Sequence, residues 1–210
     1  MFGAPETQPA RSAMNKAVLV VIALLAAGIF AVWYFYPEGK PLAPELSQAY
    51  ESGGESGVTI RYPEGWSEDT TYAYQELGPD RPQIYGVKFY VPRSFTDGTN
   101  LSEDTGLSLE ILPGLDECVA GYFLSSGSPA LTLLVDDVRY SVAYSDEGAA
   151  GNRYEETVYA LHGTDPCIAV RYFIHYGVYK NYEPGLVKEF DREALVRELD
   201  AMRRTLFVPR

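Results

Sequence analysis

Histidine and cysteine are scarce in this 210-residue chain, which contains 2 His and 2 Cys. A zinc centre needs three or four ligands that are mostly His, Cys or carboxylate, so two separated histidines argue against one. No Cys-x-x-Cys pair is present to act as a redox centre, and no Gly-x-Ser-x-Gly turn is present to carry a serine nucleophile. The sequence therefore predicts no catalytic set, no metal site and no cofactor.

Basic residues are also few, with 17 Lys and Arg against 29 Asp and Glu and a formal net charge of −12. Residues 58–210 alone contain 24 acidic and 14 basic residues, which gives that region a net charge near −10. Such a surface repels phosphate backbones and anionic lipid headgroups, so we expect no nucleic-acid partner. The acidic pairs lack the spacing of a calcium loop and are expected to be solvated. These pairs are Glu103-Asp104, Asp136-Asp137 and Asp146-Glu147.

One long uncharged run contrasts with this composition, from Ala17 to Tyr36. At about 1.5 Å per residue it makes about 30 Å of helix, which matches the hydrocarbon core of a bilayer. The run ends in four aromatic residues, whereas a cleaved signal peptide ends in small residues. We therefore expect a transmembrane helix over 17–36 that is retained as a signal anchor, with cleavage as the alternative.

The charges that flank this run predict its orientation. Arg11 and Lys16 precede it, and Lys40 is the one basic residue that follows it closely. By the positive-inside rule, residues 1–16 form a cytoplasmic tail and the C-terminal region lies outside the cytoplasmic membrane, in the periplasm if the source is bacterial. No cysteine follows the run closely, which argues against a lipid-modified N-terminus.

The remaining chain divides into a linker and one domain. Residues 37–57 are rich in Pro and Gly without a sustained hydrophobic period, which predicts a flexible linker. Residues 58–210 are long enough for one domain with a real core, and they contain 14 of the 17 tyrosines. Tyr, Val and Ile favour strands. We therefore expect a sheet-rich domain.

Local patterns place the elements of this domain. Alternating apolar residues predict strands over 58–62, 72–77, 84–91 and 107–112, and over 131–144 as one long strand or a bent pair. The polar segment 92–105 reads as a loop, and 118–124 as one or two helical turns. Asp191 can cap a helix that runs to about Arg204, with Leu195, Leu199 and Met202 on one face, before a short strand over 206–208.

Cys118 and Cys167 are both expected outside the cytoplasm, where a disulfide between them is stable. It would close a loop of about 50 residues and stabilise the fold by about 4 kcal/mol in the chain-entropy model. The alternative is two separate buried thiols.

A hairpin over 153–162 and 167–176 carries the candidate binding residues. Its expected register puts His175 opposite Tyr154 and brings Arg171 and Glu156 to the same face. These four residues could bind an anion or a partner's carboxylate, and the alternative is a cross-strand ion pair with exposed neighbours. Tyr182, on the turn 181–185, could be an exposed interface anchor or a buried plug at the end of the sheet.

The outline resembles the Mog1/PsbP-like domains over most of residues 58–208. Two short motifs carry the resemblance, Tyr62-Pro63-x-x-Trp66 after a first strand and Leu206-Phe207-Val208 after a closing helix. The resemblance implies an α+β domain, an antiparallel β-sheet flanked by helices, that acts as a binding or assembly module. It implies no individual functional residue.

The sequence thus favours a membrane-anchored extracytoplasmic binding or assembly module without catalytic activity, whose partner is another membrane or envelope protein. A tethered carboxylate-dependent hydrolase and a receptor domain for a small ligand are the alternatives. A pocket with convergent carboxylates would favour the hydrolase, and a flat apolar and aromatic patch would favour the binding module.

Overall fold

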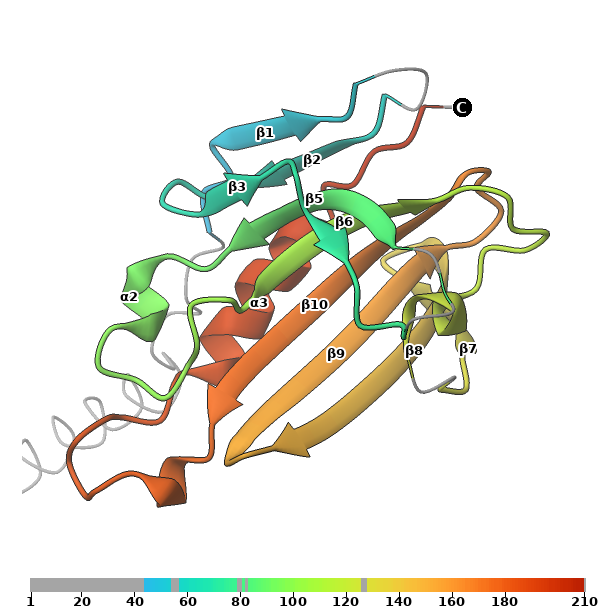
Figure 1. Ribbon diagram of the computed structural model, residues 1–210. Helices are drawn as coiled ribbons and strands as arrows, with labels where there is room; N and C mark the ends of the chain where they lie inside the picture. The colour runs from blue at the N-terminus through green and yellow to red at the C-terminus, as the bar shows by residue number, and fades with distance from the viewer. Residues whose placement is uncertain (1–43, 54–56, 79–80, 82, 126–127, 210) are drawn as a thin grey trace, which may run out of the picture. The chain divides into compact units, whose positions relative to one another are not determined.

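The computed structural model describes residues 44–53, 57–78, 81, 83–125 and 128–209. Its main element is an eight-stranded antiparallel sheet (Figure 1). The strand order is β3-β5-β6-β10-β9-β8-β7, and β4 also pairs with β5. The strands are β3 (Ser67–Asp69), β4 (Ala73–Tyr74), β5 (Ile84–Tyr90), β6 (Gly106–Leu112), β7 (Leu131–Val135), β8 (Val138–Ala149), β9 (Asn152–Leu161) and β10 (Cys167–Gly177). A second sheet pairs β1 (Gln48–Glu51) with β2 (Thr59–Tyr62), and Phe207 forms a bridge to Thr59 of β2.

The prediction of an α+β fold with helices flanking the sheet is wrong. Within the described residues, α3 (Arg192–Arg203) is the one helix longer than a single turn, because α2 (Arg93–Thr96) has four residues. The two 3₁₀ turns are η1 (Ala120–Phe123) and η2 (Tyr179–Asn181). Apolar residues recur at period two through most of the domain and at period 3.6 only near its end, so the fold is mainly antiparallel β. No helix among the described residues is long and apolar enough to span a membrane, and the helix predicted over 17–36 lies outside them.

The predicted C-terminal helix is confirmed as α3, which crosses one face of the sheet (Figure 1). Asp191 is its N-cap, and the Asp191 carboxylate accepts a 2.9 Å hydrogen bond from the backbone N–H of Ala194. Leu195, Leu199 and Met202 are fully buried in the main apolar core with residues of β5, β6 and β10. Burial of this stripe is what holds the helix on the sheet.

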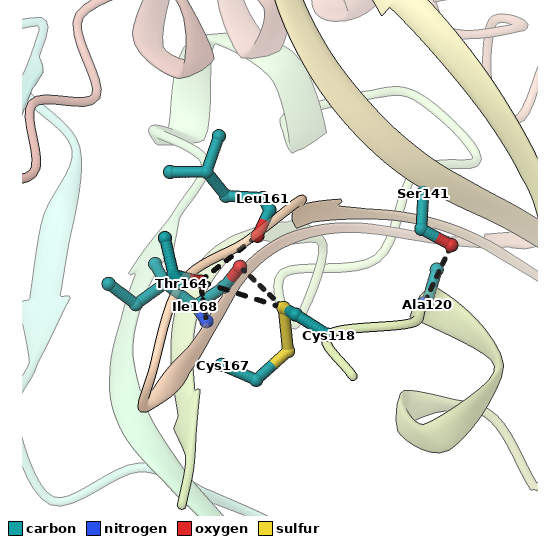
Figure 2. The surroundings of a disulfide bond; sticks show 7 residues. All are labelled: Cys118, Ala120, Ser141, Leu161, Thr164, Cys167 and Ile168. Atoms are coloured by element: carbon teal, nitrogen blue, oxygen red, sulfur yellow. Dashed lines mark hydrogen bonds between the residues drawn. A yellow bond between two sulfur atoms is a disulfide. The ribbon is translucent and has the colours of Figure 1, made fainter. Parts of the chain in front are cut away.

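The segment around η1 covers part of the opposite face and is tied down by the predicted disulfide, which the structure confirms between Cys118 and Cys167 (Figure 2). Cys167 begins β10, so the bond joins the segment to a central strand. Phe123 and Leu124 are buried in a second apolar cluster with Val158 of β9 and Ala169 of β10. The helical turn predicted over 118–124 is confirmed as η1, and the disulfide and this cluster hold it on this face.

Several local predictions change. Residues 131–144 belong to a pair of strands rather than to one long strand, because Asp136 and Asp137 make a tight turn between β7 and β8 with φ of 51° and 63°. Positive φ at both central residues is typical of the two-residue hairpin turn that matches strand twist, and Asp tolerates this conformation. The expected linker contains β1, and the expected polar loop contains α2.

Candidate functional site

The β9–β10 hairpin has the register that the sequence predicts, with His175 opposite Tyr154 and Arg171 opposite Val158. Side chains alternate between the two faces of a strand, so Arg171, Phe173 and His175 share one face with Tyr154 and Glu156. We call this the polar face. Ile168, Val170, Tyr172 and Ile174 point to the other face, where α3 packs.

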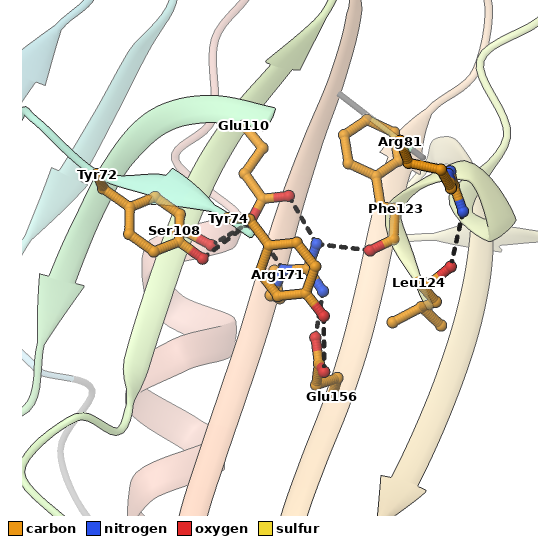
Figure 3. Close-up of polar contacts among 9 residues, drawn as sticks. All are labelled: Tyr72, Tyr74, Arg81, Ser108, Glu110, Phe123, Leu124, Glu156 and Arg171. Carbon is orange, nitrogen blue, oxygen red and sulfur yellow. Dashed lines mark hydrogen bonds and ion pairs between the residues drawn. The ribbon is translucent and has the colours of Figure 1, made fainter. Parts of the chain in front are cut away.

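Arg171 lies at the centre of the polar face and has no exposed surface. Its guanidinium donates to both carboxylate oxygens of Glu110, with Nε–Oε1 and Nη2–Oε2 distances of 2.7 and 2.8 Å (Figure 3). It also bonds to Glu156 and donates to the backbone oxygen of Phe123 at 2.7 Å. The ring of Tyr74 stacks on the guanidinium, with its centroid 3.6 Å from Cζ. This set is the Arg171 cluster.

Two hydroxyl groups also bind the carboxylates of the Arg171 cluster. The hydroxyl of Ser108 donates to Glu110 at 2.7 Å, and that of Tyr74 donates to Glu156 at 3.0 Å. Burial opposes the charged form of Arg171, but the attraction of Glu110 and Glu156 outweighs it and raises the pKa of the guanidinium. Arg171 is therefore a buried cation whose donors serve the sheet and the η1 segment. It holds no free fork of donors for a ligand carboxylate or phosphate.

Lys88 of β5 lies on the same face and is 6% exposed. Its amino group sits over three aromatic rings, 4.5 Å from the centroid of Phe173, 4.8 Å from Tyr90 and 5.6 Å from Tyr72. Among the described residues no carboxylate lies within ion-pair distance of it. Burial lowers the pKa of Lys88 to about 8, although Asp104 partly opposes the shift. Cation–π contacts with these three rings stabilise the ammonium group.

His175 and Tyr154 form the outer end of the polar face. Their rings stack with centroids 4.3 Å apart, and Nδ1 of His175 lies 2.8 Å from a carboxylate oxygen of Asp104. Its Nε2 is buried and has no hydrogen-bond partner among the described residues. Tyr182 is half-buried and packs over Gly177, where a Cβ atom would come within 2.1 Å of its hydroxyl. The candidate residues therefore do meet on one face, but in two groups separated by the ring of Phe173.

The sequence prediction missed Glu110 and Lys88. Both could have been found from the alternation of their strands, because Val87, Phe89, Leu107 and Leu109 predict one buried face and leave Lys88, Ser108 and Glu110 on the other. Chemically, the polar face pairs carboxylates with one arginine and an aspartate with one histidine. No group of three or more metal-ligating side chains is found in the part of the chain that the structure describes.

The edge of the sheet at β7 (Leu131–Val135) carries exposed apolar side chains. β7 pairs only with β8 among the described strands, so it is an edge strand. Three of its five residues are exposed leucines, with Leu131 65%, Leu133 43% and Leu134 70% accessible. Leu131 and Leu133 lie on the side of α3, and Leu134 lies on the polar face.

A groove lined by both apolar and polar residues adjoins this edge on the α3 side. It has a volume of about 1060 Å³, and its walls come from the start of β8, the β9–β10 loop and the segment after α3. Val138 and Tyr140 line it and are the cross-strand partners of Val135 and Leu133. Phe207, 60% exposed, is on the opposite wall. The exposed leucines of β7 therefore continue into the apolar lining of the groove.

Comparisons with known proteins do not assign the chain to a family. No family model and no curated protein matches it. A crystal structure of a protein from Bacteroides thetaiotaomicron VPI-5482 is similar, with a TM-score of 0.45 and 11% sequence identity. The match covers 79% of this chain and 50% of that protein, so the chain spans about half the length of the protein that it matches. The resemblance to Mog1/PsbP-like domains stays a prediction, because neither the structural neighbour nor the missing family matches bear on it.

Proposed function

We propose that the domain is a non-catalytic binding module of the cell envelope, and that it binds a strand of a second envelope-protein chain along β7. The proposal depends on one observation, that the outer edge of β7 is open among the described strands and has three exposed leucines. An edge strand offers unpaired main-chain groups, and strand addition uses them for affinity while alternate side chains give specificity. Exposed apolar side chains gathered at such an edge are typical of an interaction surface.

The composition of β7 supports this proposal. Proteins usually block edge strands with charged residues, proline, bulges or a covering loop. The sequence Leu-Thr-Leu-Leu-Val of β7 has no charge and no proline, and it pairs with β8 without a bulge. Among the described strands this edge is open, in a chain whose formal net charge is −12.

The polar face gives less support to a hydrolase. A hydrolase with two carboxylates needs one to be a free base or nucleophile and one to hold a proton. Glu110 and Glu156 both bind the Arg171 guanidinium, so neither carboxylate is free to attack or to accept a proton from a substrate. The alternative of a small-ligand receptor rests on the groove beside β7, whose volume is at the upper limit of the range for ligand pockets.

The location outside the cytoplasm is part of the proposal. A disulfide whose two cysteines are both buried is consistent with an oxidising compartment. Placement in the cytoplasmic membrane, with the domain outside, stays a prediction that rests on residues 17–36.

Photocrosslinking in intact cells tests the proposal. A photoreactive amino acid replaces Leu134 in the full-length chain, and a second chain carries it at Tyr85. Tyr85 is the matched control because it is 65% exposed and lies on β5, away from β7. We expect a discrete protein adduct at position 134 and none above background at position 85. Equal labelling at both positions, or no adduct at position 134, would refute binding along β7.

A further inference from the structure

We infer that the strand bound along β7 is β7 of a second copy of this chain, in a two-fold antiparallel pairing centred on Leu133. This inference rests on the proposed function, because it uses the same edge. It goes further by naming the partner, the strand direction and the register.

The hydrogen bonds of β8 decide which residues of β7 point their backbone N–H and C=O groups out from the edge. The backbone N–H of His162 donates to the backbone oxygen of Arg139 at 3.1 Å, so the main-chain groups of Arg139 face β9. Because these directions alternate along a strand, the groups of Val138 and Tyr140 face β7. Their partners Val135 and Leu133 therefore bond to β8. It follows that Thr132 and Leu134 direct their N–H and C=O groups out from the edge.

These outward groups fit a second copy of themselves. In an antiparallel pair, two residues with outward groups exchange both hydrogen bonds. If Thr132 of one copy lies opposite Leu134 of the other, the two-fold axis passes at Leu133 and all four outward residues are bonded. This register also overlaps all five residues of each β7. Shifting it by two residues leaves part of each strand without a partner.

The same register matches the side chains. On the α3 side, Leu133 lies opposite its own copy, and Leu131 lies opposite Val135, so one apolar stripe runs across both strands. On the polar face, Leu134 lies opposite Thr132. The leucines that are exposed in one copy would be covered by apolar neighbours in the pair. A sequence that is apolar on both sides of its central residue suits such an isologous contact.

Charge is also compatible with this pairing. β7 itself is uncharged, and the antiparallel register puts Asp136 opposite Ala130 and Asp137 opposite Pro129. A parallel in-register pair would instead bring the two Asp136-Asp137 turns side by side. The one opposing term is the repulsion between two acidic domains, which salt screens. Added salt should therefore strengthen the association.

Single cysteine substitutions give a sharp test in the full-length protein. The two Cα atoms at position 133 would be about 4.5 Å apart as a non-hydrogen-bonded pair. A disulfide spans about 4.4–6.8 Å between Cα atoms, so Leu133→Cys should crosslink two copies under mild oxidation. Position 131 would lie about 13 Å from its own copy, at about 3.3 Å per residue, so Leu131→Cys should not crosslink. The two native cysteines are bonded to each other and do not compete.

A blocking variant completes the experiment. Thr132→Pro removes a backbone N–H that faces outward and leaves the β8 bonds in place, so it should abolish dimers in light scattering without unfolding the chain. Equal crosslinking at positions 131 and 133 would overturn the inference, and so would a Thr132→Pro variant that remains dimeric. A monomeric chain whose position 134 captures a different protein would overturn the second copy while leaving the proposed function standing. No adduct at position 134 would remove both.

Discussion

Replacing Arg171 with methionine tests the reading of the Arg171 cluster as a structural element. The substitution keeps an unbranched side chain of similar length and removes the cation. It leaves two carboxylates without the arginine charge, that of Glu110, which is fully buried, and that of Glu156, which is largely buried. Removing one partner of a buried ion pair costs about 3–5 kcal/mol, and a domain of this kind has about 5–15 kcal/mol in total. We therefore expect a loss of about 3–5 kcal/mol in the free energy of unfolding.

Guanidinium denaturation followed by far-UV circular dichroism measures this loss. A second variant, Arg171→Met with Glu110→Gln, removes the stranded charge while keeping its shape. We expect it to be more stable than Arg171→Met alone by about 1–3 kcal/mol, the usual coupling between residues in contact. This pair of variants separates lost attraction from the cost of a buried unpaired carboxylate.

A loss below about 1 kcal/mol for Arg171→Met would refute the reasoning, because it is the behaviour of an exposed ion pair. Equal stability of the single and the double variant would likewise show that the buried Glu110 carboxylate costs nothing when it is left unpaired.

Three further predictions concern stability. Because burial lowers the pKa of Lys88 to about 8, the folded chain should gain stability as pH rises from about 8 to about 10.4, where the unfolded lysine loses its proton. Lys88→Met should remove this gain in denaturation curves and be more stable at pH 7, and a profile parallel to the unchanged chain would contradict it. Reducing the Cys118–Cys167 bond should lower the unfolding free energy by up to about 4 kcal/mol, and a change below about 1 kcal/mol would show that packing alone holds the η1 segment. Asp191→Ala should cost about 1 kcal/mol by removing the N-cap of α3, and an unchanged denaturation midpoint would rule that cap out.

Much of the strand layout could be predicted from the sequence because antiparallel strands carry a local signal. Alternation alone placed β5, β6, β9 and β10 within about two residues, and the loop at 163–166 set the hairpin register. The disulfide was predictable because two cysteines allow one pairing. The helix α3 was predictable because its cap and its apolar stripe agree.

The errors have a common physical origin, since they concern what covers a sheet rather than what forms one. The helices expected to flank the sheet were inferred from a family outline, and nothing local specifies which segment covers the polar face. That role falls to the η1 segment, whose short apolar stretch is helical for only four residues. Arg203 shows the same limit. Its position in the last turn of α3 gives no sign of burial, but it is 2% exposed and donates to the Tyr172 hydroxyl at 3.0 Å.

The Arg171 cluster and the β7 edge differ in what remains unsatisfied, and this difference favours the edge as the binding surface. Arg171 has its donors matched by Glu110, Glu156 and Phe123, so a ligand there would have to break existing bonds. Thr132 and Leu134 have outward main-chain groups that gain partners when a strand arrives. Binding at the edge adds bonds and covers exposed leucine side chains without dismantling the core. A site that the folded chain leaves incomplete is therefore a better candidate for recognition than the buried charged cluster that drew attention in the sequence.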